Sequence, residues 1–309
     1  MEQTKLFVLT GFLGAGKTTF LKRILHNLEG TKVGVIQNDL GKVNIDGELI
    51  EKDGLELREI SQGSIYCSCR KLDFVKALAE LAQRGLDYVL VESSGIGDPS
   101  NVKELLQAVE VLQPGAYRFT GLICLVDAAN FLEDSGSREE LARQVRHAHV
   151  ILLNKTDLVE PEEQEKVLAV LRELNPVAPI YSAAYGEIDM GFLQEDLRKY
   201  QYVDGEPSLN SSESKPKTLV LRTTQPMNRE KLDSFLSQLA PQCWRMKGFL
   251  PLDTGWHQVD VVGKYIDYKP CQAREQGELV IISRIGPAVI RPIIDTWKDI
   301  VGTEMTLKN

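Results

Sequence analysis

The chain has 309 residues, of which 43% are hydrophobic and 26% are charged, and its formal net charge at pH 7 is −8. This composition is ordinary for a globular protein, and the length suits two domains. The negative charge argues against nucleic acid or an anionic membrane as a partner, because both require a basic surface.

No run of eighteen apolar residues predicts a membrane span, and the amino terminus lacks the basic start and the cleavage site of a signal peptide. We therefore expect a cytoplasmic protein with no membrane partner. Its few cysteines suit reduced thiols better than a disulfide framework. They are Cys67, Cys69, Cys124, Cys243 and Cys271.

The first 201 residues alternate between buried strand patterns and amphipathic helix patterns. The strands are predicted at 5–12, 32–39, 87–95, 120–128, 149–155 and 179–184. The helices are predicted at 18–29, 72–85, 101–112, 137–148 and 161–174. Continuously apolar strands that alternate with helices predict an α/β domain with a mainly parallel sheet covered on both faces.

Residues 202–217 are polar and rich in proline and serine, which predicts a flexible linker. After it, residues 218–309 show strand patterns near 218–224, 244–250, 257–268 and 278–285, and helix patterns near 230–239 and 290–301. They predict a small α+β domain. We expect its tryptophans to pack in the core or on a partner surface; they are Trp244, Trp256 and Trp297.

The segment Gly11–Thr18, GFLGAGKT, matches the phosphate-binding pattern G-x-x-x-x-G-K-[ST] between a predicted strand and a predicted helix. Its glycines let the backbone turn tightly and direct N–H groups at phosphate oxygens. Lys17 would bring its charge to the terminal phosphates, and the Thr18 hydroxyl would bind magnesium. The residues expected to contact nucleotide here are Gly11, Gly14, Ala15, Gly16, Lys17, Thr18 and Thr19.

The segment Asn154–Asp157, NKTD, follows a buried strand at the sheet edge where open α/β sheets bind ligands. The Asp157 carboxylate can accept two hydrogen bonds from guanine, whereas adenine would leave it unpaired. We expect the Lys155 stem to lie along the base and Asn154 to connect this loop to the P-loop. A backbone N–H of Ser182 or Ala183 would meet the guanine carbonyl.

Two further strand ends supply candidates for the hydrolytic step. Glu92 would lie in the second coordination shell of magnesium, and a Gly95 N–H would contact the γ-phosphate and sense its loss. Asn38 and Asp39 form the expected first switch, in which Asp39 holds magnesium, orients the attacking water or only caps a turn. No residue is recognisable as an arginine finger.

Several motifs in the same order resemble those of the CobW-like GTPases: GFLGAGKTT, NDLGKVNIDGELI, VESSGIGDP, VDAANF, LLNKTDLV, MKGFL and GELVII. That family includes candidate metal chaperones and nitrile hydratase activators, and it is related to the nickel-inserting GTPases for hydrogenase and urease. The resemblance is strongest up to about residue 200. It implies a GTPase domain, a small C-terminal domain and metal delivery coupled to the nucleotide cycle.

The chain departs from the family in its metal motif, which is a G-C-x-C-C segment followed by an arginine and an aspartate. The corresponding stretch runs from 63 to 70, with Asp73 nearby. When the stretch is aligned with the family motif on Gly63 and Arg70, Ser64 and Tyr66 occupy the positions of the first two family cysteines. Cys67 is kept. The family switch N-E-F-G-E reads N-D-L-G-K here, and the family's histidine-rich linker is absent.

Cys67 and Cys69 are the candidate ligands of a transition metal. A structural zinc site has four ligands, so the ligands missing beside these two thiolates must come from Asp39, a histidine or a dimer partner. The neighbouring Arg70 would favour the thiolate form. The alternative interpretation is that Cys67 and Cys69 are two partly buried small side chains in a loop and bind no metal. His147 and His149, which flank a helix end, are expected to be structural or solvated.

The sequence therefore predicts a GTP-binding protein that hydrolyses GTP to GDP at a slow basal rate and acts as a switch for delivery or insertion of a metal or metallocofactor into a client protein. The alternative is a metal-independent switch that chaperones a client enzyme. A small-molecule kinase is disfavoured, because NKTD and the ESSG segment suit hydrolysis. The expected cofactors are GTP or GDP, magnesium, and zinc, cobalt or a corrinoid. A nucleotide-dependent homodimer is a further expected partner.

Overall fold

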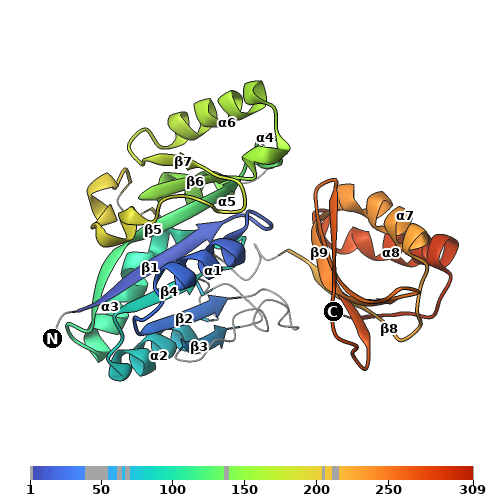
Figure 1. Cartoon of the computed structure of the whole chain (residues 1–309), viewed down its shortest axis with the longest axis horizontal. Coiled ribbons are helices and arrows are strands. Elements are labelled where there is room, and N and C mark those ends of the chain that lie inside the picture. Colours follow the sequence, from blue (N-terminus) through green and yellow to red (C-terminus); the bar gives the residue numbers. More distant parts are fainter. Residues whose placement is uncertain are drawn as a thin grey trace. The chain divides into compact units, whose positions relative to one another are not determined.

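The computed structural model describes residues 3–38, 55–60, 65–66, 70–135, 139–203, 206–210 and 216–308. The chain folds into two compact units, Met1–Ser214 and Lys215–Asn309 (Figure 1). The linker predicted at 202–217 contains the segment 206–210, which hydrogen-bonds to the first unit. In the part of the chain that the structure describes, no helix has the length and apolarity needed to cross a membrane.

The first unit contains a seven-stranded sheet in the order β3-β2-β4-β1-β5-β6-β7, and every neighbouring pair is parallel. Its strands are β1 (Thr4–Gly11), β2 (Val33–Asn38), β3 (Leu55–Ile60), β4 (Tyr88–Glu92), β5 (Tyr117–Asp127), β6 (Val150–Asn154) and β7 (Ile180–Ser182). The strand order reverses between β1 and β4, so the carboxyl ends of β1, β4 and β5 open beside one another.

Helices cover both faces of this sheet, as the apolar strands predict. They are α1 (Lys17–Asn27), α2 (Lys71–Leu81), α3 (Val102–Leu112), α4 (Phe131–Ser135), α5 (Glu139–Arg146) and α6 (Pro161–Leu174). On one face, Phe20 and Ile24 of α1 pack with Phe7 and Leu125 in a core whose members are almost fully buried. Phe192 and Leu197 of two short 3-10 turns extend this core.

The second unit is a six-stranded antiparallel sheet with α7 (Arg229–Leu239) and α8 (Ile290–Thr296) packed on one face (Figure 1). Its strand order is β11-β10-β9-β12-β8-β13. The strands are β8 (Thr218–Thr223), β9 (Cys243–Leu252), β10 (Gly255–Val262), β11 (Tyr265–Pro270), β12 (Gly277–Ser283) and β13 (Thr306–Lys308). The predicted α/β fold with a small C-terminal α+β domain is confirmed.

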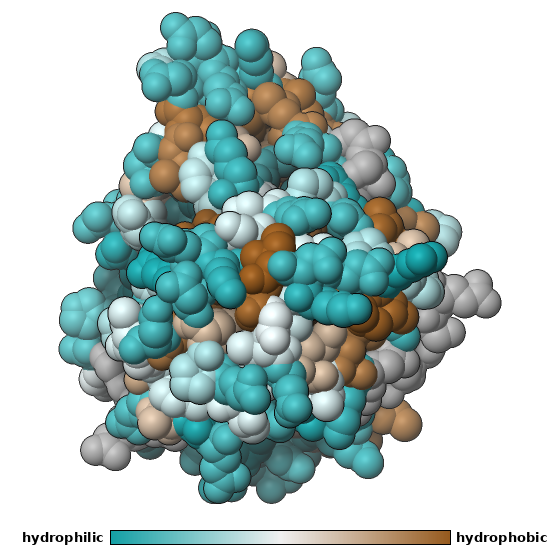
Figure 2. All heavy atoms as spheres, turned by 90° about the vertical axis from the view of Figure 1, so that its right-hand side faces the viewer, coloured by the Kyte–Doolittle hydropathy of each residue, from teal (hydrophilic) through white to brown (hydrophobic). Residues whose placement is uncertain are grey.

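The tryptophans divide between core and surface of this unit. The Trp297 ring is buried and meets Phe235 edge to face, with 5.0 Å between ring centroids. Trp244 is nearly buried beneath the guanidinium of Arg284, and Trp256 is half-buried. Figure 2 shows a mostly hydrophilic face on which apolar residues form small separate groups.

The sequence patterns miss β3 at the sheet edge. Its sequence, LELREI, has Glu56 between two leucines and then two charged residues in a row, and Glu56, Leu57 and Arg58 are half-buried. The parallel pairing with β2 therefore determines this strand more than its own composition does.

Asn175 follows α6, and its side chain bonds to the end of α5 and to the segment that leads into β7. Its amide donates to the carbonyls of Val145 and Ala148 at 2.9 and 3.0 Å, and its oxygen accepts from the N–H groups of Val177 and Ala178. The side chain is fully buried. One buried side chain therefore bonds to five backbone groups, because its amide also donates to the Arg146 carbonyl at 3.3 Å.

The substitution Asn175→Ala should lower the free energy of unfolding by about 2–4 kcal/mol, because buried backbone groups lose their partners. Urea denaturation of the purified variant measures the change. The matched control is Asn27→Ala at an exposed position, which should change stability by less than about 0.5 kcal/mol. Equal stabilities of the two variants would contradict this role of Asn175.

Candidate nucleotide-binding site

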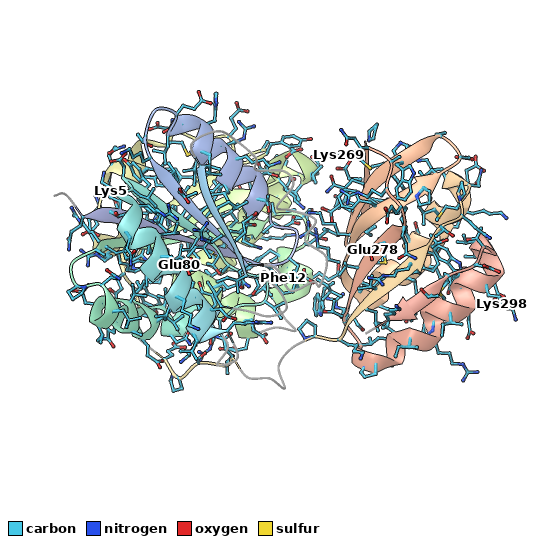
Figure 3. All side chains as sticks on the ribbon, turned by 90° about the horizontal axis from the view of Figure 1, so that it is seen from below. Lys5, Phe12, Glu80, Lys269, Glu278 and Lys298 are labelled. Carbon is cyan, nitrogen blue, oxygen red and sulfur yellow. The ribbon has the colours of Figure 1, made fainter. Side chains whose placement is uncertain are left out.

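The phosphate-binding loop lies between the end of β1 at Gly11 and the start of α1 at Lys17. Figure 3 labels Lys5 near the start of β1 and Phe12 just beyond its end, at the carboxyl edge of the sheet. Gly11 has φ 133°, and a Cβ there would lie 2.2 Å from the Leu125 oxygen. Gly16 has φ 99°, and a Cβ there would lie 2.4 Å from the side-chain nitrogen of Asn154. Both positions therefore require glycine.

The Lys17 side chain is buried inside this loop. Its ammonium group donates to the carbonyl oxygens of Gly11 and Phe12 at 2.8 and 3.0 Å. The loop therefore holds a positive charge at the start of α1, where the helix dipole also favours an anion.

Three polar side chains meet where β2 and β4 end beside α1. The Thr18 hydroxyl donates to one carboxylate oxygen of Glu92 at 2.7 Å, and the Gln37 amide donates to the other at 2.9 Å. Glu92 is almost fully buried, so these bonds offset the cost of removing its charge from water. The hydroxyl and carboxylate oxygens are the donor type that magnesium prefers.

Asn38 connects the ends of the strands on this side of the sheet. Its oxygen accepts from the N–H groups of Ile65 and Ser94 at 2.9 and 3.2 Å, and its amide donates to the carbonyl of Ile60 at 2.9 Å. The next residue, Asp39, lies outside the described residues, and its predicted contact with magnesium or water stays a prediction.

Gly95, the predicted sensor of the γ-phosphate, packs directly on the P-loop. A Cβ at this glycine would lie 2.7 Å from the backbone nitrogen of Leu13 and 2.6 Å from its side chain. The loop after β4 is also tied to β1 through a bond from the Ser93 N–H to the Leu9 carbonyl at 2.9 Å. The backbone of Gly95 is therefore beside the phosphate-binding loop.

Asn154 holds the loop after β6 against the P-loop. Its side-chain nitrogen donates to the Ala15 carbonyl at 2.9 Å, and its oxygen accepts from the Gly186 N–H at 2.8 Å. The carbonyl of the same Tyr185–Gly186 peptide accepts from Arg23 of α1 at 2.7 Å. The loop that follows β7 is therefore fixed to both the P-loop helix and the NKTD segment.

Lys155 and Asp157 lie on the solvent side of this arrangement. Lys155 adopts a left-handed backbone with φ 63°, and its ammonium forms a 2.8 Å ion pair with Asp127 at the end of β5. This pair directs the lysine side chain toward the end of β5, while the Asp157 side chain is exposed. The sequence patterns did not assign a role to Asp127 or Gln37; their positions at strand ends were the only signal.

The backbone of Ala183 is already engaged in the sheet. Its N–H donates to the Leu153 carbonyl at 2.8 Å, and its carbonyl accepts from both the N–H and the hydroxyl of Thr156. The Ser182 hydroxyl accepts from Gln164 at 3.1 Å. A contact from the Ala183 N–H to a guanine carbonyl would cost this sheet bond, so the geometry does not favour that prediction.

The proposed transition-metal ligands Cys67 and Cys69, together with Ser64, lie outside the described residues. Within the described ranges, no group of three or more His, Cys, Asp or Glu residues is placed to hold a metal ion. Burial raises the pKa of the Cys124 thiol and of the Cys243 thiol to about 12 in each case. Neither thiol would supply a thiolate ligand near neutral pH.

His149 serves the fold. Its Nδ1 accepts from the backbone N–H of Leu122 at 3.0 Å, which requires the neutral ring. Burial, followed by the charge of Lys103, lowers the pKa of His149 to about 4. Burial likewise lowers the pKa of His147. These contacts are consistent with structural roles for both residues.

The His149 ring should make stability depend on pH. The unfolded chain, with an ordinary histidine pKa near ~6.5, binds a proton before the folded chain does. The contribution of His149 to the free energy of unfolding is therefore fully present above about pH 6.5. It is lost as the pH falls toward about 4, and the loss amounts to up to about 3 kcal/mol. Urea denaturation at pH 7 and pH 5 should show a smaller loss for His149→Gln than for the wild type. The exposed control His26→Gln should behave like the wild type; equal losses in all three proteins would contradict the assignment.

The strand, glycine loop and helix around Lys17, with the NKTD loop bonded to the P-loop, define a P-loop nucleotide-binding protein. The model of the CobW/HypB/UreG nucleotide-binding domain matches residues 5–182, and that of the cobalamin synthesis protein cobW C-terminal domain matches residues 217–292. The chain belongs to the CobW/HypB/UreG family.

Named relatives share parts of the chain. The zinc chaperone YjiA of Escherichia coli (strain K12) is 36% identical over 199 residues, which are 62% of this chain and 61% of the relative. The zinc-regulated GTPase metalloprotein activator 1 of Dictyostelium discoideum is 28% identical over 300 residues, covering 80% of this chain and 63% of the relative. The chain thus spans less than two thirds of either relative. The crystal structure of Zn(II)-bound YjiA GTPase from E. coli superposes with a TM-score of 0.47 at 26% identity, covering 97% of this chain and 99% of that one.

Proposed function

We propose that this protein binds GTP, hydrolyses it slowly to GDP, and uses the nucleotide cycle to deliver or insert a metal ion or metallocofactor into a client protein. The observation that carries the nucleotide part is the Asn154 side chain, which bonds the base loop to the P-loop. Through this contact the lysine that would meet phosphate and the aspartate that would meet the base belong to one site.

The phosphate end of the site would act by position and charge. Lys17, now held by two loop carbonyls, would turn its charge to the terminal phosphates, and the loop N–H groups would cradle the oxygens. Thr18 and Glu92 offer the oxygen donors that suit magnesium, whose charge would offset that of the triphosphate. Asp39 remains our candidate for orienting the attacking water.

Guanine selection would rest on Asp157. Its exposed carboxylate can accept from both the ring N–H and the exocyclic amine of guanine. Lys155, extended toward Asp127, would lie along the base. Adenine has no ring N–H at that place, so the carboxylate would stay unpaired.

Asp157→Asn should weaken GTP binding by about 100-fold or more and favour xanthosine triphosphate, because the new amide can donate to the extra carbonyl of xanthine. Calorimetric titration of wild type and variant with both nucleotides measures the change. Equal affinity of the wild type for ATP and GTP would contradict the guanine assignment.

Basal hydrolysis should lie near ~10⁻⁴–10⁻² s⁻¹, as for GTPases without a partner's arginine, and Lys17→Ala should abolish it.

Metal delivery is supported by the names of the relatives, which are a zinc chaperone and a zinc-regulated metalloprotein activator. Cys67 and Cys69 are the candidate ligands in this chain. The metal-independent client switch stays as a second candidate because of one observation: Tyr66, which stands where the family has a cysteine, is fully buried. A buried phenol at this position removes a ligand that the family motif supplies.

Metal affinity should differ between the GTP and GDP states if Cys67 and Cys69 form a nucleotide-coupled site, because a ligand shifts an equilibrium only by its differential affinity. Zinc, cobalt and a corrinoid are titrated into the wild type and Cys67→Ser/Cys69→Ser, each with GDP and a non-hydrolysable GTP analogue. Cys271→Ser, in the second unit, is the matched thiol control. Binding should weaken as the pH falls, because thiolate ligation releases protons.

Identical binding by the wild type and the double variant in both nucleotide states would remove the cysteines from the metal site. The metal-independent client switch would then be the better account.

A further inference from the structure

Helix α5 contacts the loop after β4 through a buried side chain. The Gln144 amide donates to the carbonyls of Gly95 and Gly97 at 3.2 and 2.9 Å, and its side chain is almost fully buried. The loop turns back on itself, since the Gly97 N–H donates to the Ser94 carbonyl at 3.0 Å. Gln144 therefore binds two of the four carbonyl groups in the stretch from Ser94 to Gly97.

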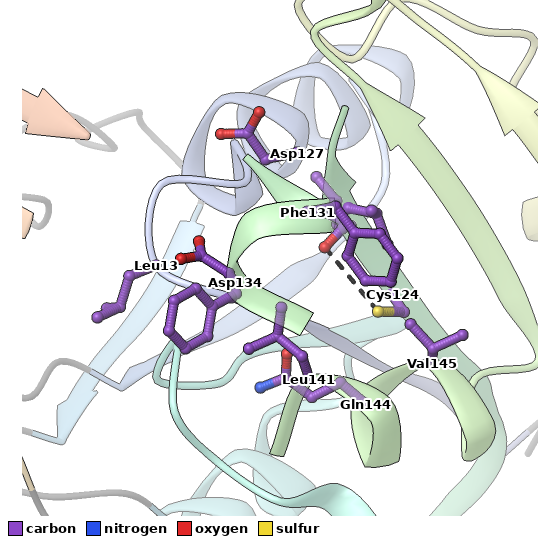
Figure 4. Close-up of a pocket in the computed structure, with 11 residues that line it drawn as sticks. Leu13, Cys124, Asp127, Phe131, Asp134, Leu141, Gln144 and Val145 are labelled. Atoms are coloured by element: carbon purple, nitrogen blue, oxygen red, sulfur yellow. Dashed lines mark hydrogen bonds between the residues drawn. The ribbon is translucent and has the colours of Figure 1, made fainter. Parts of the chain in front are cut away.

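The P-loop contacts this loop from the other side. Gly95 lies against Leu13 so closely that a Cβ on the glycine would overlap the Leu13 backbone. Leu13 and Gln144 also line the same small cavity beside the end of β5 (Figure 4). The backbone of Gly95 is thus held between the P-loop and α5.

The same loop ends at a buried ion pair. The Asp98 side chain has no solvent exposure, and one of its oxygens lies 2.9 Å from the Arg143 guanidinium, which comes from the residue next to Gln144. The other oxygen accepts from the Ser100 N–H at 3.0 Å. A carboxylate this deep must be paired, because an unpaired buried charge is strongly destabilising.

The segment 206–210 completes the surroundings of this pair. The Leu209 N–H donates to Asp98 at 2.8 Å, and Asn210 exchanges two bonds with the Asp98 backbone at 3.0 and 2.7 Å. Arg143 donates to the Pro207 carbonyl at 2.7 Å. We call Asp98, Arg143 and residues 206–210 the Asp98 network. In the sequence, this segment directly precedes the stretch that leads to β8 of the second unit.

We propose that Gln144 is a positioning residue that sets Gly95 for contact with the γ-phosphate, and that the Asp98 network couples this loop to the anchoring of segment 206–210. The inference rests on the proposed GTPase function and deepens it by naming how the site is regulated. A shift of the loop on nucleotide exchange strains the Gln144 bonds and the Asp98 network together, because one short loop carries both. The coupling is reciprocal, so weakening the anchor changes the balance of nucleotide affinities.

The first arm of the test addresses positioning. Gln144→Leu keeps the size of the side chain and removes both donors, so kcat for GTP should fall about 10-fold or more while GDP affinity stays within about threefold. Gln144→Asn shortens the side chain and should recover only part of the rate. The matched control is Gln107→Leu on the exposed face of α3, which should leave kcat unchanged.

The second arm addresses the coupling. Asn210→Ala removes two bonds to Asp98 at the surface end of the network and should change the ratio of GTP-analogue to GDP affinity by about fivefold or more. Hydrogen exchange at the Leu209 amide should differ between the two nucleotide states in the wild type and become fast in both states in Asn210→Ala. The control Asn228→Ala removes comparable side-chain bonds in the second unit and should leave the affinity ratio unchanged.

The outcomes separate this proposal from the proposed function. A wild type that binds no guanine nucleotide contradicts the GTPase function itself. Normal nucleotide binding, with unchanged kcat in Gln144→Leu and an unchanged affinity ratio in Asn210→Ala, overturns the coupling and leaves the GTPase function intact. If Gln144→Leu does not fold, the affinity ratio and the amide exchange of Asn210→Ala decide alone, and loss of thermal stability without a change in either overturns the proposal.

Discussion

The two hydrogen bonds of the Asn154 side chain hold the nucleotide site together. One fixes the P-loop through Ala15, and the other fixes the loop after β7 through Gly186. A Cβ at Gly16 would displace the amide, so the glycine and the asparagine depend on each other. The rest of the carboxyl edge is organised around this contact, because β1, β6 and β7 present their loops to it.

Three side chains at this edge that would meet the nucleotide or its metal, those of Lys17, Thr18 and Lys155, each have a partner within the described structure. Lys17 bonds to loop carbonyls, Thr18 bonds to Glu92, and Lys155 pairs with Asp127. Such groups would otherwise be costly to bury. Each bond involves an atom that a nucleotide or its metal could also use. Nucleotide binding would therefore replace these internal bonds with bonds to the ligand, and would not add unpaired charges to the site.

Sequence patterns were enough for the fold class and for the positions of Gly11–Thr18 and Asn154–Asp157, since glycine spacing and apolar strands are local signals. They could not find β3, whose three charged residues conceal a half-buried edge strand, or the N–H of Ala183, which already bonds to the Leu153 carbonyl. Gln144 and Asp98 were also missed, because most of their partners lie 45 to 112 residues away in the chain and no periodicity reports such contacts. Tertiary pairing of buried polar groups is the part that the patterns do not encode.

The burial of Cys124 and Cys243 has a practical consequence for redox chemistry. Because the thiolate is the species that reacts with alkylating agents and oxidants, a thiol with a pKa near 12 is nearly inert while the protein stays folded. A short treatment of the native protein with an alkylating agent should then leave Cys124 and Cys243 unmodified. Counting modified thiols before and after unfolding therefore measures how far Cys124 and Cys243 are protected, without any change to the sequence.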